Sequence, residues 1–361
     1  MEMRILRVRK NRAMNISTAL GLSLALPFLL AGNVPATRLV FAPAAGTSLA
    51  KSFESKSTLT LDDMQMTGLP GAAPEIEMDM KIDQTWSVID DYTKMTDGRP
   101  SVLVRTFDAI GSKVDMSMSM EFMGQAQENS TNVEGKSELE GKKVVFTWDA
   151  KESAYTKAFD PTGPEEKLLD GLTEDADFRA LLPNKEVAEN DEWSVDPKDL
   201  SAVFNPCGNL SIVPEEKDGE DPLMGSNGLD SMSELMTGIE GEAKARFAGM
   251  REVEGQSYAV IAVEFKVKSQ ADLTEKVKEQ MESSGQELPV TLEKVDMEWS
   301  SEGKGELLWN VKEGHFVSFE MDAETTLKSV EEMSIDAGGR QMSLTQTRNM
   351  SGSTAFVAKA K

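Results

Sequence analysis

The stretch Gly303–Met333, GKGELLWNVKEGHFVSFEMDAETTLKSVEEM, decides the fold class of this chain. Its second half alternates strictly, with one parity holding Val317, Phe319, Met321, Ala323, Thr325 and Leu327. The other parity is polar except for Phe316, and a period of two predicts a strand with one dry and one wet face. Leu307, Trp309 and Val311 predict a shorter strand before the turn Lys312-Glu313-Gly314, where glycine supplies the positive φ of a tight hairpin. The stretch therefore predicts a long hairpin in an antiparallel sheet with one solvated face.

The composition bounds the protein class. The chain has 361 residues, 39% hydrophobic and 28% charged, which fits about two domains or one large β domain with a buried core. It carries 62 acidic and 38 basic residues. Removing residues 1–44, with six basic residues and one acidic, leaves 32 basic against 61 acidic, a net charge of −29. Such a surface repels phosphate backbones, so we expect no nucleic-acid partner.

Residues 1–44 resemble a secretory signal. A basic start (Arg4, Arg7, Arg9, Lys10, Arg12) precedes an apolar run from Ala13 to Ala31, and small-residue exits follow at Val34-Pro35-Ala36 and Ala42-Pro43-Ala44. The apolar segment would engage the membrane during export. We therefore expect a periplasmic or secreted protein of a bacterial cell envelope, or one tethered by the uncleaved segment. The single Cys207 excludes an intramolecular disulfide and suits an oxidising compartment.

The rest of the chain divides into three parts. Residues 45–160 and 239–361 alternate like antiparallel strands, separated by turn signals. Residues 161–238 differ, with short helices expected at Pro164–Leu169, Glu174–Leu182 and Pro197–Phe204 and an acidic, glycine-rich loop at Glu215–Gly228. One longer helix is expected at Leu273–Ser283. The expected fold is mainly β (α+β): a curved antiparallel sheet, or two, or a half-barrel, with a few short helices packed on one side.

The two β units contain similar hairpins. Trp148-Asp149-Ala150-Lys151-Glu152-Ser153-Ala154-Tyr155 aligns with Trp309-Asn310-Val311-Lys312-Glu313-Gly314-His315-Phe316. The Trp, Lys-Glu and aromatic positions coincide, which suggests a duplication. The alternative is that any Trp-bearing hairpin has this pattern.

The 22 methionines form the most distinctive pattern. The candidate ligand-binding residues are Met78, Met80, Met116, Met118 and Met120, which recur with the period of a strand. The simplest interpretation is that they line a core, because methionine fills irregular apolar space. Two alternatives are an adaptable cavity for a lipid-like ligand and, since thioethers bind soft ions, a copper(I) site.

No catalytic or metal site emerges from the remaining residues. Glu174–Asp177 and Asp218–Asp221 offer oxygen ligands but lack the EF-hand spacing, and we interpret them as solvated. Cys207 could find a base only in His315, the single histidine, so we expect a buried, inert thiol and an exposed turn histidine. We expect no cofactor, no metal and no catalytic residues.

The chain resembles two groups of known proteins. The segments Leu181-Leu182-Pro183 and Trp193-Ser194-Val195, with the signal and the β-rich body, resemble a family of exported bacterial proteins of uncharacterised function. The strand order resembles the lipoprotein-carrier superfamily, in which a curved sheet covered by helices holds an acyl chain. The resemblance implies an envelope protein that binds an apolar ligand or a partner protein without catalysis. The alternatives are a structural or interaction protein with a filled core and acidic surface, and a carboxylate-based envelope hydrolase.

Overall fold

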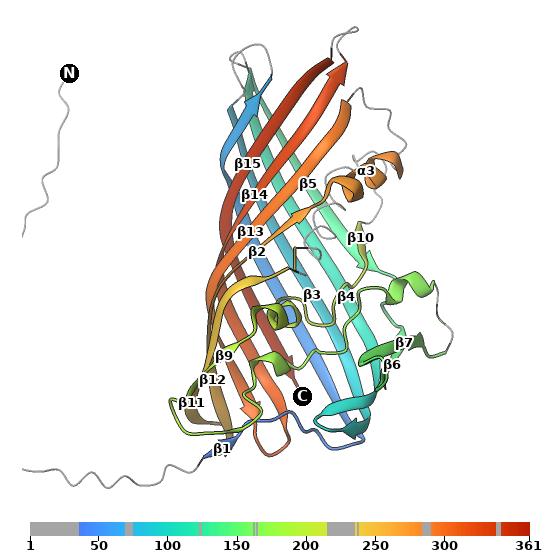
Figure 1. Ribbon diagram of the computed structural model, residues 1–361, viewed down its shortest axis with the longest axis vertical. Helices are drawn as coiled ribbons and strands as arrows, with labels where there is room; N and C mark the ends of the chain where they lie inside the picture. The colour runs from blue at the N-terminus through green and yellow to red at the C-terminus, as the bar shows by residue number, and fades with distance from the viewer. Residues whose placement is uncertain are drawn as a thin grey trace, which may run out of the picture. The chain divides into compact units, whose positions relative to one another are not determined.

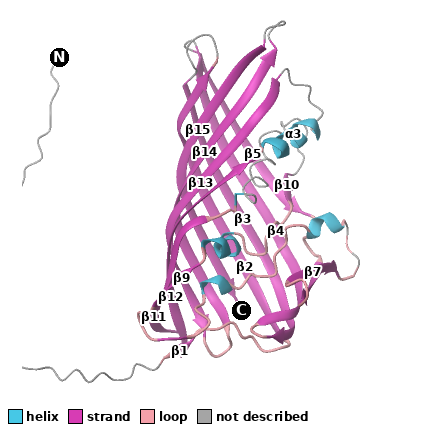
Figure 2. Cartoon of the chain, viewed as in Figure 1, coloured by secondary structure: helices cyan, strands magenta, loops and turns pink. Residues whose placement is uncertain are grey.

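The computed structural model describes residues 36–68, 75–122, 125–161, 163, 165–214, 235–236, 238–283, 290–336 and 341–361. They belong to the compact unit Pro35–Lys361. Most of the unit is strand, as Figure 2 shows. The long strands are β2 (Thr47–Thr67), β3 (Glu75–Thr96), β4 (Arg99–Phe122), β5 (Gln125–Ser137), β11 (Glu240–Val253), β12 (Gln256–Asp272), β13 (Val290–Asn310), β14 (His315–Asp336) and β15 (Gln341–Ala360).

These strands join one antiparallel sheet, 13-stranded in the described residues, with the order β10-β5-β4-β3-β2-β15-β14-β13-β12-β11-β9 (Figure 1). β6 (Lys143–Asp149) pairs with β4, and β7 (Ala154–Phe159) pairs with β6. Since β2 pairs with β15, the two β units expected from the sequence share this sheet. The prediction of a curved antiparallel sheet with a few helices is confirmed. Within the described residues the sheet is open, with β10 (Ile212–Pro214) and β9 (Glu192–Val195) at its edges.

The long hairpin predicted from residues 303–333 is present. β13 and β14 pair almost throughout, with Trp309 opposite Phe316. In the second hairpin Trp148 lies opposite Tyr155, so the likeness of the two segments extends to their register. The strands around the two hairpins differ, because β4 pairs with both β5 and β6 whereas β12 pairs with β11 and β13, so the duplication stays a hypothesis.

A covering segment, residues 165–214, crosses one face of the sheet in the lower half of Figure 1. It contains the short helices η1 (Glu166–Leu169), η2 (Arg179–Leu181), η3 (Pro197–Leu200) and α1 (Ser201–Phe204), and the strand β8 (Glu186–Val187). Its β9 pairs with β11 at one sheet edge, and its β10 pairs with β5 at the other. The segment therefore ties both edges together across the face that we call the inner face.

The main core lies between the covering segment and the lower inner face. It includes Phe178 from the segment and Phe53, Phe319 and Phe356 from the sheet, whose rings lie within 6.5 Å of the Phe178 ring. Gly303 makes room in β13 for a neighbouring ring, because a Cβ there would lie 2.7 Å from Phe265. Burying these side chains is the main favourable term for holding the segment on the sheet.

The local expectations hold only in part. Glu174–Leu182 is not a helix, apart from the single 3₁₀ turn η2, because Phe178 adopts a left-handed φ of 55° that interrupts it. Residues 341–360 form the continuous strand β15. The helix expected at Leu273–Ser283 is confirmed as α3 (Thr274–Ser283). The loop expected at Glu215–Gly228 lies outside the described residues.

The start of the described chain belongs to the folded unit. β1 (Thr37–Arg38) pairs with β8, and Leu39 and Phe41 are buried in the main core. Cleavage at Ala42-Pro43-Ala44 would remove both side chains from the core. Of the two exits predicted from the sequence, Val34-Pro35-Ala36 precedes β1 and would leave both side chains in place.

Candidate functional site

The upper inner face, beyond the covering segment in Figure 1, carries a second apolar cluster. We call it the methionine patch: Leu59, Met78, Met116 and Met350 are buried, and Leu61, Met80 and Leu327 pack against them. It is contributed by β2, β3, β4, β14 and β15. Because these strands are neighbours in the sheet, the patch forms one continuous surface.

Three of the five predicted site residues meet in this patch. Met78 and Met116 are buried in it, and Met80 packs against them. Met118 lies directly opposite Met78 on the neighbouring strand, and Met120 lies opposite Ile76. Met118 and Met120 are half-buried and extend the same strand face beyond the cluster. The alternation thus predicted correctly that the five share one face, while their role in binding stays a prediction.

A smaller apolar cluster lies beside the patch, under α3. Leu273, Leu292 and Val295 are buried there, with Met297 and Met333 packed against them. α3 begins with a polar cap, because the Asp272 carboxylate accepts a hydrogen bond from the Thr274 backbone N–H at 3.0 Å. The helix therefore covers part of the upper inner face near β13.

A network of buried charges on the lower inner face was not predicted from the sequence. Lys51, Asp90, Arg105 and Asp177 are each at most 1% exposed. The expectation that Glu174–Asp177 is solvated is therefore wrong, because Glu174 and Asp177 are both buried where the covering segment contacts the sheet. The Lys51 ammonium donates to Asp90 at 2.8 Å, to Asp177 at 2.6 Å and to the Tyr92 hydroxyl at 2.6 Å. The Tyr92 hydroxyl in turn donates to Asp177. Asp177 belongs to the covering segment, so these bonds hold the segment to β2 and β3.

Arg105 completes this network from β4. Its Nε and Nη2 donate to both oxygens of Asp90 at 2.7 and 2.8 Å. Its Nη1 and Nη2 donate to the backbone carbonyls of Thr173 and Glu174 in the covering segment, each at 2.8 Å. The two cations and two carboxylates balance, and a bidentate Arg–carboxylate pair is the strongest arrangement available to them. The network is therefore satisfied inside the protein.

The electrostatics of the network favour fixed charges. Burial alone would raise the pKa of Asp90, but Arg105 and Lys51 outweigh it and lower that pKa to about 2. Burial would likewise lower the pKa of Lys51, but Asp177 and Asp90 raise it above its usual value. Burial and Asp177 raise the pKa of Tyr92 well above its usual value. A catalytic pair of carboxylates needs one member with a raised pKa, and Asp90 is not such a member because it stays ionised.

One carboxyl next to the network behaves differently. Burial raises the pKa of Glu174 to about 7, although Arg179 bonds to it. Its Oε1 is buried without a hydrogen-bond partner among the described residues. Arg179 and Asp175 line a neighbouring cavity of about 1100 Å³ at the lower end of the sheet, together with Arg38, Arg99 and Lys198 and with Asp97, Asp196 and Asp199. Because the cavity mixes cations and anions in equal number, it favours no single ligand charge.

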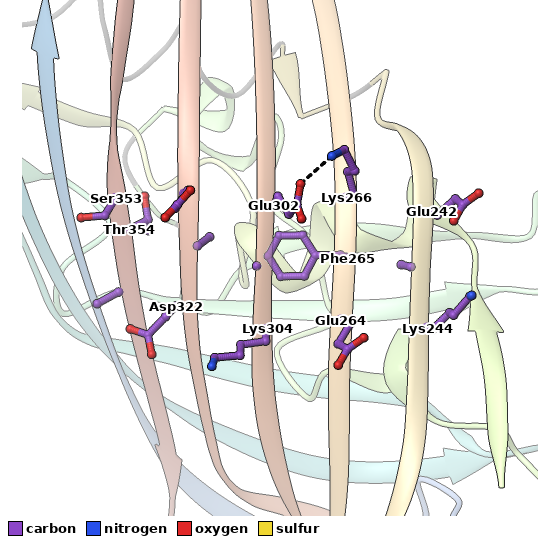
Figure 3. Close-up of a pocket in the computed structure, with 15 residues that line it drawn as sticks. Glu242, Lys244, Glu264, Phe265, Lys266, Glu302, Lys304, Asp322, Ser353 and Thr354 are labelled. Carbon is purple, nitrogen blue, oxygen red and sulfur yellow. Dashed lines mark hydrogen bonds and ion pairs between the residues drawn. The ribbon is translucent and has the colours of Figure 1, made fainter. Parts of the chain in front are cut away.

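The outer face of β11–β15 is charged. A groove of about 710 Å³ crosses it, and Figure 3 shows charged side chains in two rows beside Phe265. Across the strands, one row pairs Lys244 with Glu264, Glu264 with Lys304 and Lys304 with Asp322. Alternating charges of this kind stabilise neighbouring strands and keep the surface wet. We interpret the groove as the solvated side of the sheet.

Cys207 and His315 do not form a nucleophile–base pair, because both ring nitrogens of His315 have other partners. Cys207 is buried, as expected, and burial raises the pKa of its thiol to about 11. The expectation of an exposed His315 is wrong, because the residue is 6% exposed. Its ring nitrogens lie 2.7 Å from the Phe316 carbonyl and 3.0 Å from the Glu313 carboxylate, so the turn folds over it. Within the described ranges, no group of three or more His, Cys, Asp or Glu residues could hold a metal ion.

Comparison with known proteins identifies no family. No family model matches the chain, and no curated protein matches it. Among solved structures it is similar to the COG4313 outer membrane channel from Pseudomonas putida F1, at 7% identity and a TM-score of 0.18, covering 89% of this chain and 97% of that one. It is also similar to Pseudomonas aeruginosa OccK7 (OpdD), at 6% identity and a TM-score of 0.18, covering 87% and 99%. Similarity at this level supports no conclusion about function. Of the helices described here, none is long and apolar enough to cross a membrane.

Proposed function

We propose that this chain is an exported protein of the bacterial cell envelope that binds an apolar, lipid-like ligand without catalysis. The ligand would lie on the methionine patch and the half-buried apolar residues around it. The observation that carries the proposal is the division of the inner face into a lower part filled by the covering segment and an upper part lined by methionine.

The side chains around the patch favour a ligand over a packed core. Met64, Met66, Ile82, Met118 and Met120 are only half-buried, although their strand positions continue the inner face. A contiguous group of apolar side chains that is left partly open is typical of interaction sites. Methionine suits a ligand of variable shape, since its thioether chain is unbranched and adapts to what packs on it.

The signal-like N-terminus and the acidic surface support the proposed compartment. A charged outer face keeps an exported carrier soluble while its apolar ligand is held inside. The resemblance to the lipoprotein-carrier superfamily supports the same proposal. That this chain shares the superfamily's fold and its carrier role is part of what we propose.

The test is native mass spectrometry of the mature protein, purified without detergent, followed by organic extraction. We expect a stoichiometric co-purifying lipid. Met80→Gln/Met118→Gln places two amides on the half-open face and should abolish co-purification. Met250→Gln is the matched control, because Met250 is 49% exposed and lies on β11, away from the patch. The proposal is refuted, in favour of a structural protein, if the wild type is free of ligand and also fails to rebind lipids with 16-carbon chains.

A further inference from the structure

The upper inner face holds one charged pair within its apolar lining. By register, its positions on the described strands include Leu61 and Met64 of β2, Met350 of β15 and Leu327 of β14. Arg348 and Glu331 are the only charged residues at the described inner-face positions beyond the covering segment. A charge on an apolar surface costs desolvation free energy, so its presence calls for a partner.

Arg348 lies between the two apolar clusters. Along β15 it follows Leu344 and precedes Met350 of the methionine patch, and it lies opposite Met64 on β2 and Ser329 on β14. On the β14 side, Glu331 lies between Leu327, which packs on the patch, and Met333, which packs under α3. An apolar chain on the patch would therefore end beside this guanidinium.

The donors of Arg348 are only partly used. Its Nη2 bonds to Glu331, while its Nε is buried without a hydrogen-bond partner among the described residues. Burial lowers the pKa of Arg348, as expected for a cation that is short of acceptors. The planar fork of Arg donates to carboxylate or phosphate oxygens in a bidentate, charge-assisted arrangement, which a cationic or alcohol headgroup cannot match.

We infer that the ligand proposed above is an amphiphile with an anionic headgroup, a carboxylate or a phosphate monoester, and that Arg348 binds this headgroup. The inference rests on the proposed function and adds the ligand class. In the free protein Glu331 neutralises Arg348. In the complex the headgroup oxygens accept from the unused donors of Arg348, while the hydrocarbon chain lies over the methionine patch.

The test compares probes that share a chain and differ in charge. Delipidated mature protein is titrated with hexadecanoate, hexadecyl phosphate and hexadecan-1-ol, each below the concentration at which it aggregates, and with acetate as the headgroup alone. We expect hexadecanoate to bind at least about tenfold tighter than hexadecan-1-ol, since hydrogen bonds to charged groups contribute about that factor. Arg348→Gln should remove this preference and leave the affinity for the alcohol unchanged. Glu331→Gln should strengthen hexadecanoate binding, because it removes a competing carboxylate.

The outcomes separate this inference from the proposed function. If the wild type binds hexadecanoate and hexadecan-1-ol equally, or if Arg348→Gln weakens both alike, the headgroup inference is wrong while apolar binding stands. If acetate binds as tightly as hexadecanoate, the site takes a free anion and the amphiphile is refuted. If no long-chain probe binds the wild type, the proposed function itself fails. Should Arg348→Gln not fold, the wild-type preference and Glu331→Gln decide the question.

Discussion

Substituting Lys51 by methionine isolates the contribution of the buried network. Methionine has nearly the same length, so the change removes the ammonium and little volume. The substitution removes three hydrogen bonds, one each to Asp90, Asp177 and Tyr92. Asp90 keeps its bidentate bond to Arg105, whereas Asp177 keeps only the Tyr92 hydroxyl and becomes an uncompensated buried charge.

The expected loss in the free energy of unfolding depends on the burial of the ion pair more than on the distance between its charges. Removing one partner of a buried ion pair lowers the free energy of unfolding by about 3–5 kcal/mol. Lys266→Met is the matched control, because Lys266 lies at the same 2.6 Å from Glu302 as Lys51 from Asp177. The control pair is 78% and 66% exposed, while the buried pair is 0% exposed. An exposed pair contributes at most about 1 kcal/mol, so the control should change stability little.

A double variant tests the mechanism. Lys51→Met/Asp177→Asn removes the stranded carboxylate, so we expect it to be no less stable than Lys51→Met alone, with a coupling energy of about 2 kcal/mol or more. Urea unfolding followed by tryptophan fluorescence measures five proteins: the wild type, Lys51→Met, Asp177→Asn, the double variant and the control Lys266→Met. If Lys51→Met costs as little as Lys266→Met, or if the two network substitutions add within about 0.5 kcal/mol, the network does not hold the covering segment as described.

Two further predictions concern two other buried titratable groups, Glu174 and Cys207. The pKa of Glu174 is raised from 4.5 to about 7 in the folded state, so its contribution is full below pH 4.5 and lost as the pH rises through 7. Unfolding titrations from pH 5 to 8 should therefore show a loss of up to about 3 kcal/mol that Glu174→Gln abolishes; an identical pH profile in the variant would contradict this. Iodoacetamide at pH 8, followed by mass spectrometry, should label Cys207 at least about 100-fold faster in urea than in the folded protein, because burial disfavours the thiolate; equal rates would show an accessible thiol.

The fold class could be predicted because alternation is a local signal. The run from Val317 to Leu327 shows its period within eleven residues, and β14 follows it. The pairing of β2 with β15 could not be predicted, because it joins residues about 300 positions apart and leaves no mark on either strand. The same limit left open whether the two β units share a sheet. Short helices were harder still, since a single left-handed residue, Phe178, interrupts the helix expected at Glu174–Leu182.

The candidate site could be predicted only in part, again because the sequence shows local alternation and no long-range contacts. The methionines share one strand face by parity alone, so Met78 and Met116 could be assigned to the same face from the sequence. The sequence does contain a signal of the buried network, because its charged residues lie on the apolar face of their strands. Lys51 lies between Leu49 and Phe53, Asp90 between Val88 and Tyr92, and Arg105 between Leu103 and Phe107. Their partners could not be read from it, since Asp177 lies 126 residues from Lys51. A charged residue on the apolar face of a predicted strand therefore indicates a buried charge.

Two arginines on the same face of this sheet show how such a signal divides into structure and function. Arg105 uses its Nε and both terminal nitrogens on Asp90 and two carbonyls of the covering segment, so its place is fixed by the fold. Arg348 uses one nitrogen on Glu331 and leaves Nε buried without a partner among the described residues. Since a buried donor without an acceptor costs about 1–3 kcal/mol, the proposed headgroup would remove that cost by accepting from Arg348. Losing Arg105 should therefore loosen the covering segment, whereas losing Arg348 should change which ligand the methionine patch accepts.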